Sequence, residues 1–101
     1  LDQSYYQVAD KREILVRLQN NIKKRQIAAE DYEAALETVI ATEKIAPNEY
    51  KLLLDKGVLL AKNTQSREAI ETLERYINLT PFEHDRQDAL MFIEQIHQEL
   101  I

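Results

Sequence analysis

The chain repeats a short phrase at an interval of 34 residues. "EAALETV" fills 33–39 and "REAIETL" fills 67–73, which places Ala35 and Ala69 at equivalent positions. Only four of the 19 residues in 30–48 are identical to their partners in 64–82, but the kind of residue recurs. A small residue is followed four positions later by a large apolar one, and later by a proline. Such a period is typical of stacked helical units that bury their faces against one another.

Composition and apolar periodicity predict helices throughout. The 101 residues include one glycine and two prolines, so few residues would break a helix. No stretch shows the strict alternation of an amphipathic strand. The predicted helices cover about 10–28, 31–45, 48–62, 66–79 and 83–100. Asn48 is the expected cap of the third. The last either opens within 80–83, with Pro81 as its first helical residue, or starts nearer Asp85. The short connections predict antiparallel neighbours in an all-α domain over 10–101.

The apolar spacing also predicts faces on these helices. Four residues of the first helix share one face, namely Ile14, Leu15, Leu18 and Ile22. Arg12 and Lys23 lie opposite them, so we expect both side chains to be solvated. In the second helix a buried stripe is predicted at Tyr32, Ala35, Leu36, Val39 and Ile40. In the third, Leu53, Gly57 and Leu60 follow helical spacing.

The repeat resembles the tetratricopeptide repeat family, whose 34-residue unit is a helix–turn–helix. A unit at about 50–81 carries five of the family's motif residues, Gly57, Leu60, Ala69, Leu73 and Pro81. A unit at about 16–47 keeps Ile22, Ala35, Val39 and Pro47, but departs from the motif at Gln19, Lys23 and Gln26. The resemblance implies two repeats plus a C-terminal capping helix at about 83–100, as a fragment of a right-handed α-solenoid.

A narrower resemblance covers roughly 12–82. "LDKGVLL" and "EAIETLERYINLTP" are similar to the C-terminal repeat module of SirB-type transglutaminase-like proteins. This resemblance implies a non-catalytic interaction module, with 1–9 as a linker from an upstream transglutaminase-like or protease-like domain. Two alternatives stay open. The chain could be a free-standing peptide-binding adaptor, or an enzyme fragment whose first helix helps to cover an upstream active site.

The family's usual groove positions imply a partner-binding site on the first and third helices. Its candidate residues are Arg17, Asn20, Asn21, Lys24, Ile27, Lys51, Leu54, Asp55 and Val58. The last helix would add Asp88, Phe92 and Gln95 to this groove. Asparagine can pair with a peptide backbone, and lysine can attract a carboxylate. A second surface, for contact with another domain or a second copy, is expected at Tyr5, Tyr6, Met91 and Phe92.

Other classes of function find little support. There is no cysteine, and His84 and His97 stand 13 residues apart, so we expect neither a metal site nor a cofactor. Residues 11–25 hold six basic residues against one acidic residue, yet the whole chain is acidic and no aromatic residue interleaves with these cations. We therefore expect a protein partner rather than nucleic acid or membrane, and a cytoplasmic location.

Overall fold

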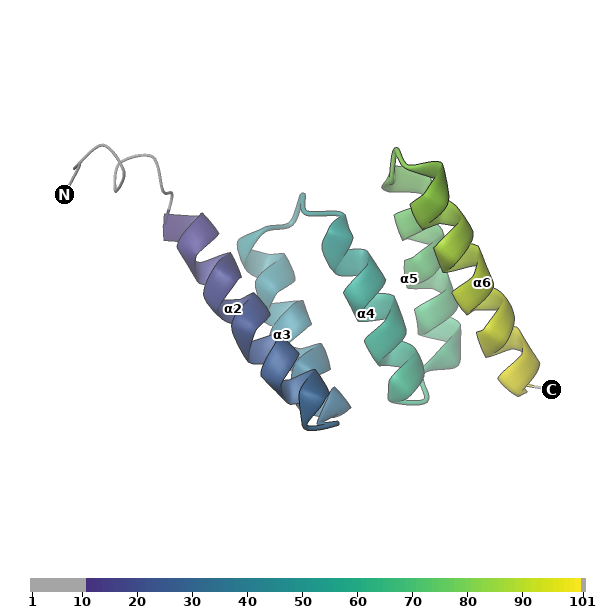
Figure 1. The fold of residues 1–101 in the computed structure, drawn as a ribbon, viewed down its shortest axis with the longest axis horizontal. Helices are drawn as coiled ribbons and strands as arrows, with labels where there is room; N and C mark the ends of the chain where they lie inside the picture. The colour runs from purple at the N-terminus through teal and green to yellow at the C-terminus, as the bar shows by residue number, and fades with distance from the viewer. Residues whose placement is uncertain (1–10, 101) are drawn as a thin grey trace.

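The computed structural model describes residues 11–100, and in that range it contains five helices and no strand. They are α2 (Lys11–Ala28), α3 (Tyr32–Ile45), α4 (Lys51–Lys62), α5 (Ser66–Leu79) and α6 (Glu83–Leu100). Consecutive helices run antiparallel (Figure 1). The prediction of an all-α fold is confirmed. The proposed linker at 1–9 lies outside the described residues.

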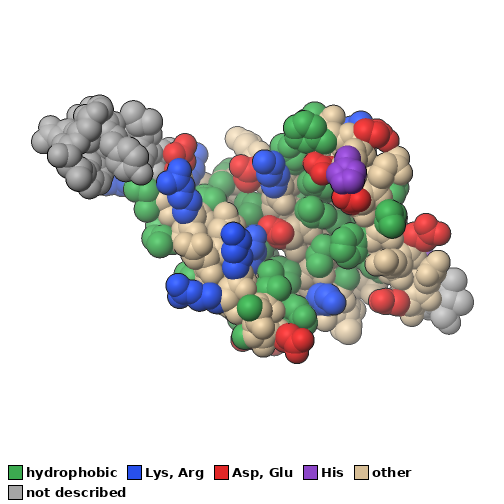
Figure 2. Space-filling model, in the orientation of Figure 1, with side chains coloured by type: hydrophobic (Ala, Val, Ile, Leu, Met, Phe, Trp, Pro, Cys, Tyr) green, Lys and Arg blue, Asp and Glu red, His purple; other side chains and the backbone are tan. Residues whose placement is uncertain are grey.

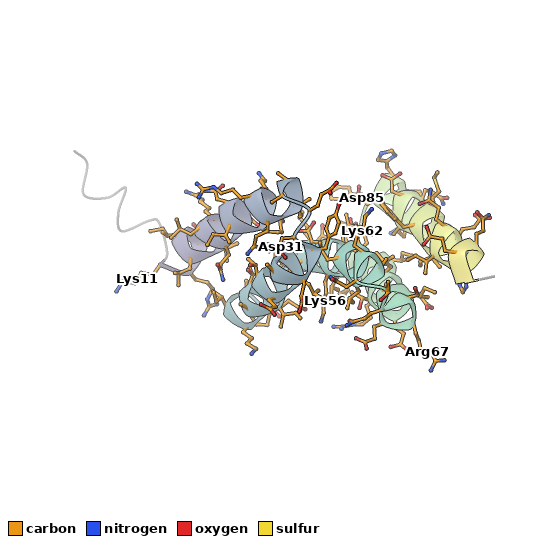
Figure 3. The ribbon with its side chains drawn as sticks, turned by 90° about the horizontal axis from the view of Figure 1, so that it is seen from below. Lys11, Asp31, Lys56, Lys62, Arg67 and Asp85 are labelled. Carbon is orange, nitrogen blue, oxygen red and sulfur yellow. The ribbon has the colours of Figure 1, made fainter. Side chains whose placement is uncertain are left out.

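The helices form two layers. In Figure 1, α2, α4 and α6 lie in front of α3 and α5, and the view from below in Figure 3 shows the same separation. The central helix is α4, which packs against α3, α5 and α6. By contrast, α2 packs closely only against α3, and it lies at one end of the array. The helices α2, α4 and α6 therefore share one broad face of the molecule.

The hydrophobic core contains most of the apolar residues of the two repeated stretches, 33–39 and 67–73. Its main cluster joins α3, α4, α5 and α6 through eight buried residues, Ala35, Leu36, Val39, Leu59, Leu60, Ala69, Leu73 and Ile96. Gly57 lies where α4 approaches α5 most tightly. A Cβ atom added to it would stand 2.6 Å from both Cγ and Cδ2 of Leu73. The motif glycine is therefore required by packing, because a larger residue would collide with the centre of the core.

The turns repeat with the same 34-residue interval. Glu30 and Thr64 both have positive φ angles, of 59° and 63°. The next amide in each turn reaches back across the helix end, from Asp31 to the Gln26 carbonyl and from Gln65 to the Leu60 carbonyl, at 2.9 Å in both cases. This pairing satisfies carbonyls that a helix end would leave open. The duplication in the sequence is thus also a duplication of backbone geometry.

The first residues of α4 and α6 can be compared with the predicted helix starts. Helix α4 begins at Lys51 rather than at about 48, and Tyr50 precedes it without a side-chain cap. Asn48 is not the cap, because the carbonyls of Glu49 and Tyr50 accept the first amide bonds instead. Helix α6 begins at Glu83, so the prediction that Pro81 is its first residue is wrong, and Thr80 instead is the C-cap of α5.

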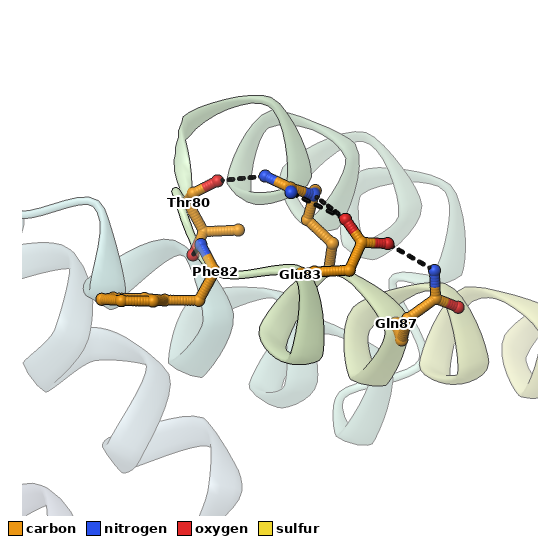
Figure 4. A network of polar contacts seen from close by, with 5 residues as sticks. Thr80, Phe82, Glu83 and Gln87 are labelled. Atoms are coloured by element: carbon orange, nitrogen blue, oxygen red, sulfur yellow. Dashed lines mark hydrogen bonds and ion pairs between the residues drawn. The ribbon is translucent and has the colours of Figure 1, made fainter.

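A polar network fixes the start of α6 (Figure 4). Arg86 donates to the Thr80 carbonyl at 2.7 Å and to Glu83 Oε2 at 2.7 Å and 3.0 Å. Gln87 donates to Glu83 Oε1 at 2.8 Å. These hydrogen bonds from Gln87 and Arg86, with the charge of Arg86, lower the pKa of Glu83. The network holds the turn that leads from α5 into α6.

The stripe predicted on α3 is partly wrong. Ala35, Leu36 and Val39 are buried as expected, but Ile40 is exposed and Thr42 is buried. Thr42 can be buried because its hydroxyl donates to the Thr38 carbonyl at 2.7 Å, which leaves no unpaired donor. Ile40 lies outside the part of α3 that the neighbouring helices cover.

Candidate partner-binding face

Helix α2 meets the rest of the molecule through a mainly polar face. Five residues of α2 are half-buried, namely Val16, Gln19, Asn20, Lys23 and Gln26. Gln26 Oε1 accepts a hydrogen bond of 2.7 Å from the Thr38 hydroxyl on α3. The departures from the family motif are therefore the packing residues of α2. Polar pairing replaces the apolar contacts that the motif would supply.

Lys23 contradicts the prediction that it is solvated. Its side chain is only 12% exposed, and its Nζ lies 2.7 Å from Asp55 Oδ2 on α4. Lys23 also donates to Asn20 Oδ1 at 3.3 Å. Because a charge removed from water must be paired, Asp55 is what allows Lys23 to occupy this position. The ion pair bridges α2 and α4 at the centre of their shared face.

The structure places most of the predicted groove residues around this ion pair. On α2, Arg17, Asn21 and Lys24 are exposed and follow the helical spacing that puts them on one side with Asn20 and Ile27. On α4, Lys51 is exposed, whereas Leu54 and Val58 are half-buried. Figure 2 shows this face, with basic side chains gathered over α2 and hydrophobic ones over α4 and α6. The face combines cations with an apolar surface.

Its chemistry suits binding. Exposed ammonium and guanidinium groups can attract carboxylates, Asn21 can pair with a peptide backbone, and Leu54 and Val58 can accept an apolar side chain. Arg17 also borders a hollow that Ala46 and Glu49 line from the α3–α4 connection. Among residues 11–100, no group of three or more acidic, histidine or cysteine residues is placed to hold a metal ion.

Burial raises the pKa of Tyr76, with a smaller contribution from the charge of Asp85. Tyr76 belongs to the interior, where it packs with Leu53 and Ala89, and not to this face. Its ring centroid lies 6.1 Å from that of Tyr50. We therefore assign Tyr76 a packing role between α4, α5 and α6.

The second predicted surface is only partly described. Met91 and Phe92 are exposed on α6, at 61% and 39%. Tyr5 and Tyr6 lie outside the described residues. No described helix is both long and apolar enough to cross a bilayer.

The apolar face of α2 could be predicted from the sequence, but its exposure to solvent could not. Ile14, Leu15, Leu18 and Ile22 do share one face of α2, but each is between 42% and 53% exposed. The apolar spacing correctly predicted that these four residues lie on one face. It could not show that α3 would pack on the opposite, polar side of the helix.

Comparison with known proteins agrees with this architecture. A family model described as "Tetratricopeptide repeat" matches residues 22–97. No curated protein and no solved structure matches the chain. The matched range begins in the second half of α2 and ends within α6, so it spans both helical hairpins. The chain belongs to the tetratricopeptide repeat family.

Proposed function

We propose that this chain is a non-catalytic interaction module that binds a segment of a protein partner on the face shared by α2, α4 and α6. Tetratricopeptide repeats generally mediate protein–protein interactions. The observation that carries the proposal is the Lys23–Asp55 pair, which fixes α2 against α4 at 2.7 Å. It holds two helices in one arrangement, and Arg17, Lys24 and Lys51 on the same two helices stay exposed. A prearranged face of this kind binds without first having to be ordered.

The face favours an extended peptide that carries carboxylates beside an apolar side chain. Arg17, Lys24 and Lys51 are all exposed cations, and none of them forms an ion pair within residues 11–100. Leu54 and Val58 offer half-buried apolar surface between them and α6. The cations would attract the acidic groups, and the apolar surface would hold the intervening side chain.

For the parent protein, we propose a transglutaminase-like protein of which this chain is the C-terminal repeat region. The similarity of "LDKGVLL" and "EAIETLERYINLTP" to that module supports this origin. Any Cys–His chemistry would then lie in another domain, since this chain has no cysteine. The lack of cysteine is also compatible with a reducing compartment, and we propose the cytoplasm. The rival parents are a free-standing adaptor and an enzyme whose upstream active site α2 helps to cover. The coding sequence upstream of Leu1 distinguishes the adaptor from the two enzymatic parents, because only these two require an enzymatic domain there.

Selection from a phage-displayed library of random peptides tests the binding face. We expect enrichment of acidic peptides that contain an apolar residue, and an affinity for the best synthetic peptide that falls at least about tenfold in Asn21→Ala/Lys24→Ala. Both side chains are exposed, so the melting temperature should change little. The matched control is Lys44→Ala/Asn48→Ala, which removes an exposed lysine and asparagine from α3 and from the α3–α4 connection. Failure to enrich any peptide, or equal affinities in the two double variants, would count against this face.

A further inference from the structure

An apolar row runs along the outer side of α2. Ile14, Leu18 and Ile22 follow one another at four-residue spacing, with Leu15 beside them, and all four are about half exposed. Lys11 and Arg25 continue the same row, three residues before Ile14 and three after Ile22. Figure 3 shows Lys11 projecting from the outer end of α2. We call these six residues the α2 stripe.

An apolar groove with acidic residues lies at the other end of the array, between α5 and α6. Ile70, Ile77, Leu90 and Ile93 line a hollow of about 330 Å³ there, together with Glu74. A neighbouring hollow adds Arg67 and Glu71 and shares Ile70, Glu74 and His97 with the first, so the two are continuous. Neither Glu71 nor Glu74 forms an ion pair within residues 11–100. We call this surface the α5–α6 groove.

The two surfaces are the unfinished ends of one helical array. An interior helix such as α4 is covered by α3 on one side and by α5 on the other. Among residues 11–100, α2 has close packing only from α3, and α6 packs only on α5 and α4. Units of this kind bury their apolar faces against the next unit, so an uncovered face at each end is a place for another helix. One end carries two cations beside its apolar row, and the other carries two carboxylates and one guanidinium beside its apolar groove.

We propose that the α2 stripe of one copy of this chain docks into the α5–α6 groove of a second copy. The apolar row of α2 covers Ile70, Leu90 and Ile93, while one of its two terminal cations, Lys11 or Arg25, approaches the neighbouring carboxylates of Glu71 and Glu74. This arrangement is heterologous, so each copy keeps one free stripe and one free groove, and chains of copies can grow.

Charge decides against the symmetrical alternative. Pairing two α2 stripes face to face would bring Lys11 and Arg25 of one copy onto the same cations of the other. Like charges placed opposite each other are destabilising, whereas the α5–α6 groove offers two carboxylates against one guanidinium. The contact uses neither the Lys23–Asp55 region nor the exposed cations around it, so it is independent of the proposed peptide-binding face.

Sedimentation velocity over a range of concentrations tests the contact with the chain as it exists. We expect the weight-average sedimentation coefficient to rise with concentration and the association to weaken with added salt, because part of the attraction is between exposed charges. Leu18→Glu in the stripe and Leu90→Lys in the groove should each weaken self-association at least about tenfold. Both residues are exposed at 53% and 46%, so each variant should keep its helical circular dichroism spectrum and melting temperature. The matched control is Leu79→Lys, which alters an exposed apolar residue of α5 outside the groove.

Mixing the two variants distinguishes the heterologous contact from a symmetrical one. The Leu18→Glu copy retains an intact groove, and the Leu90→Lys copy retains an intact stripe. An equimolar mixture should therefore form a dimer that cannot grow further, while each variant alone stays monomeric. A symmetrical stripe–stripe contact would instead leave Leu90→Lys fully self-associating, and this result would overturn the proposal.

A concentration-independent monomer would also overturn it. Co-sedimentation with vesicles of phosphatidylserine and phosphatidylcholine then identifies the other occupant that a basic amphipathic stripe could have. Vesicle binding that Leu18→Glu abolishes, by a protein that never self-associates, would assign the stripe to a membrane surface and exclude the docking of a second copy.

Discussion

At the residue scale, Gly57 shows most directly how a motif position is fixed by packing. Gly57→Ala would place a Cβ atom 2.6 Å from Leu73 Cγ, and Leu73 is fully buried and cannot move aside cheaply. Alanine gains about 1 kcal/mol of helix propensity, but overpacking a tight core costs about 1 to 3 kcal/mol. We therefore expect a net loss of up to about 2 kcal/mol in the free energy of unfolding, measured by urea denaturation.

A double-mutant cycle isolates the cause. In the background of Leu73→Ala the obstructing atoms are gone, so Gly57→Ala should become neutral or stabilising there. If Gly57→Ala lowered the denaturation midpoint equally in both backgrounds, the clash with Leu73 would not be the reason for the glycine.

Lys23 is a residue whose burial was not predicted from its type or its position on the helix. Its type and its position opposite the apolar row both indicated a solvated side chain, yet it is the partner of Asp55 in another helix. The signal that could have found it was its place in the motif, since Lys23 stands one 34-residue interval before the buried Gly57. A position that is packed in one repeat is a candidate for packing in the other, whatever residue occupies it.

At the element scale, both helical hairpins depend on a turn residue in the left-handed conformation. Thr64 has a φ of 63° although its side chain is β-branched, which is a costly choice for that conformation. Thr64→Gly should therefore raise the free energy of unfolding by about 0.5 to 1 kcal/mol, after allowing for the greater freedom of glycine in the unfolded chain. Thermal or urea denaturation measures the change.

The neighbouring position supplies the control. Gln65 has a φ of −95°, which any residue can adopt, so Gln65→Gly should bring no stabilisation. Glu30→Gly in the first hairpin should behave like Thr64→Gly because its φ is 59°. Destabilisation of similar size by Thr64→Gly and Gln65→Gly would show that strain at Thr64 is unimportant.

At the scale of the whole molecule, stability is unevenly distributed along the array. Helix α2 contains no buried residue, whereas α4 contains five, Leu52, Leu53, Gly57, Leu59 and Leu60. Regions with few buried contacts open at lower cost than the core. We expect backbone amides of α2 to exchange with deuterium at least about tenfold faster than those of α4 and α5, as measured by mass spectrometry at low protein concentration.

Asp55→Asn sharpens this experiment. It weakens the tie between Lys23 and α4, so exchange in α2 should accelerate further while α5 stays protected. Lys44→Ala, an exposed change on α3, serves as the control and should leave α2 unaffected. Equal protection of α2, α4 and α5 would mean that the described helices open as one cooperative unit.

The sequence by itself determined the elements and their repetition. The interval between Ala35 and Ala69 indicated stacked hairpins, and the five helices, the all-α class and the buried positions of the second repeat follow from local periodicity. These features depend on residues close together in the chain, which is why they can be read from spacing alone.

Only the tertiary structure decided which side of α2 is covered. The apolar row at Ile14, Leu18 and Ile22 predicted a face but not its neighbour, and α3 packs on the polar side instead. That choice depends on how the turn at Glu30 directs the chain and on partners far away in sequence, Thr38 and Asp55, which satisfy Gln26 and Lys23. The spacing of apolar residues shows which side chains share a face of a helix. Whether that face is buried depends on the helices that pack around it.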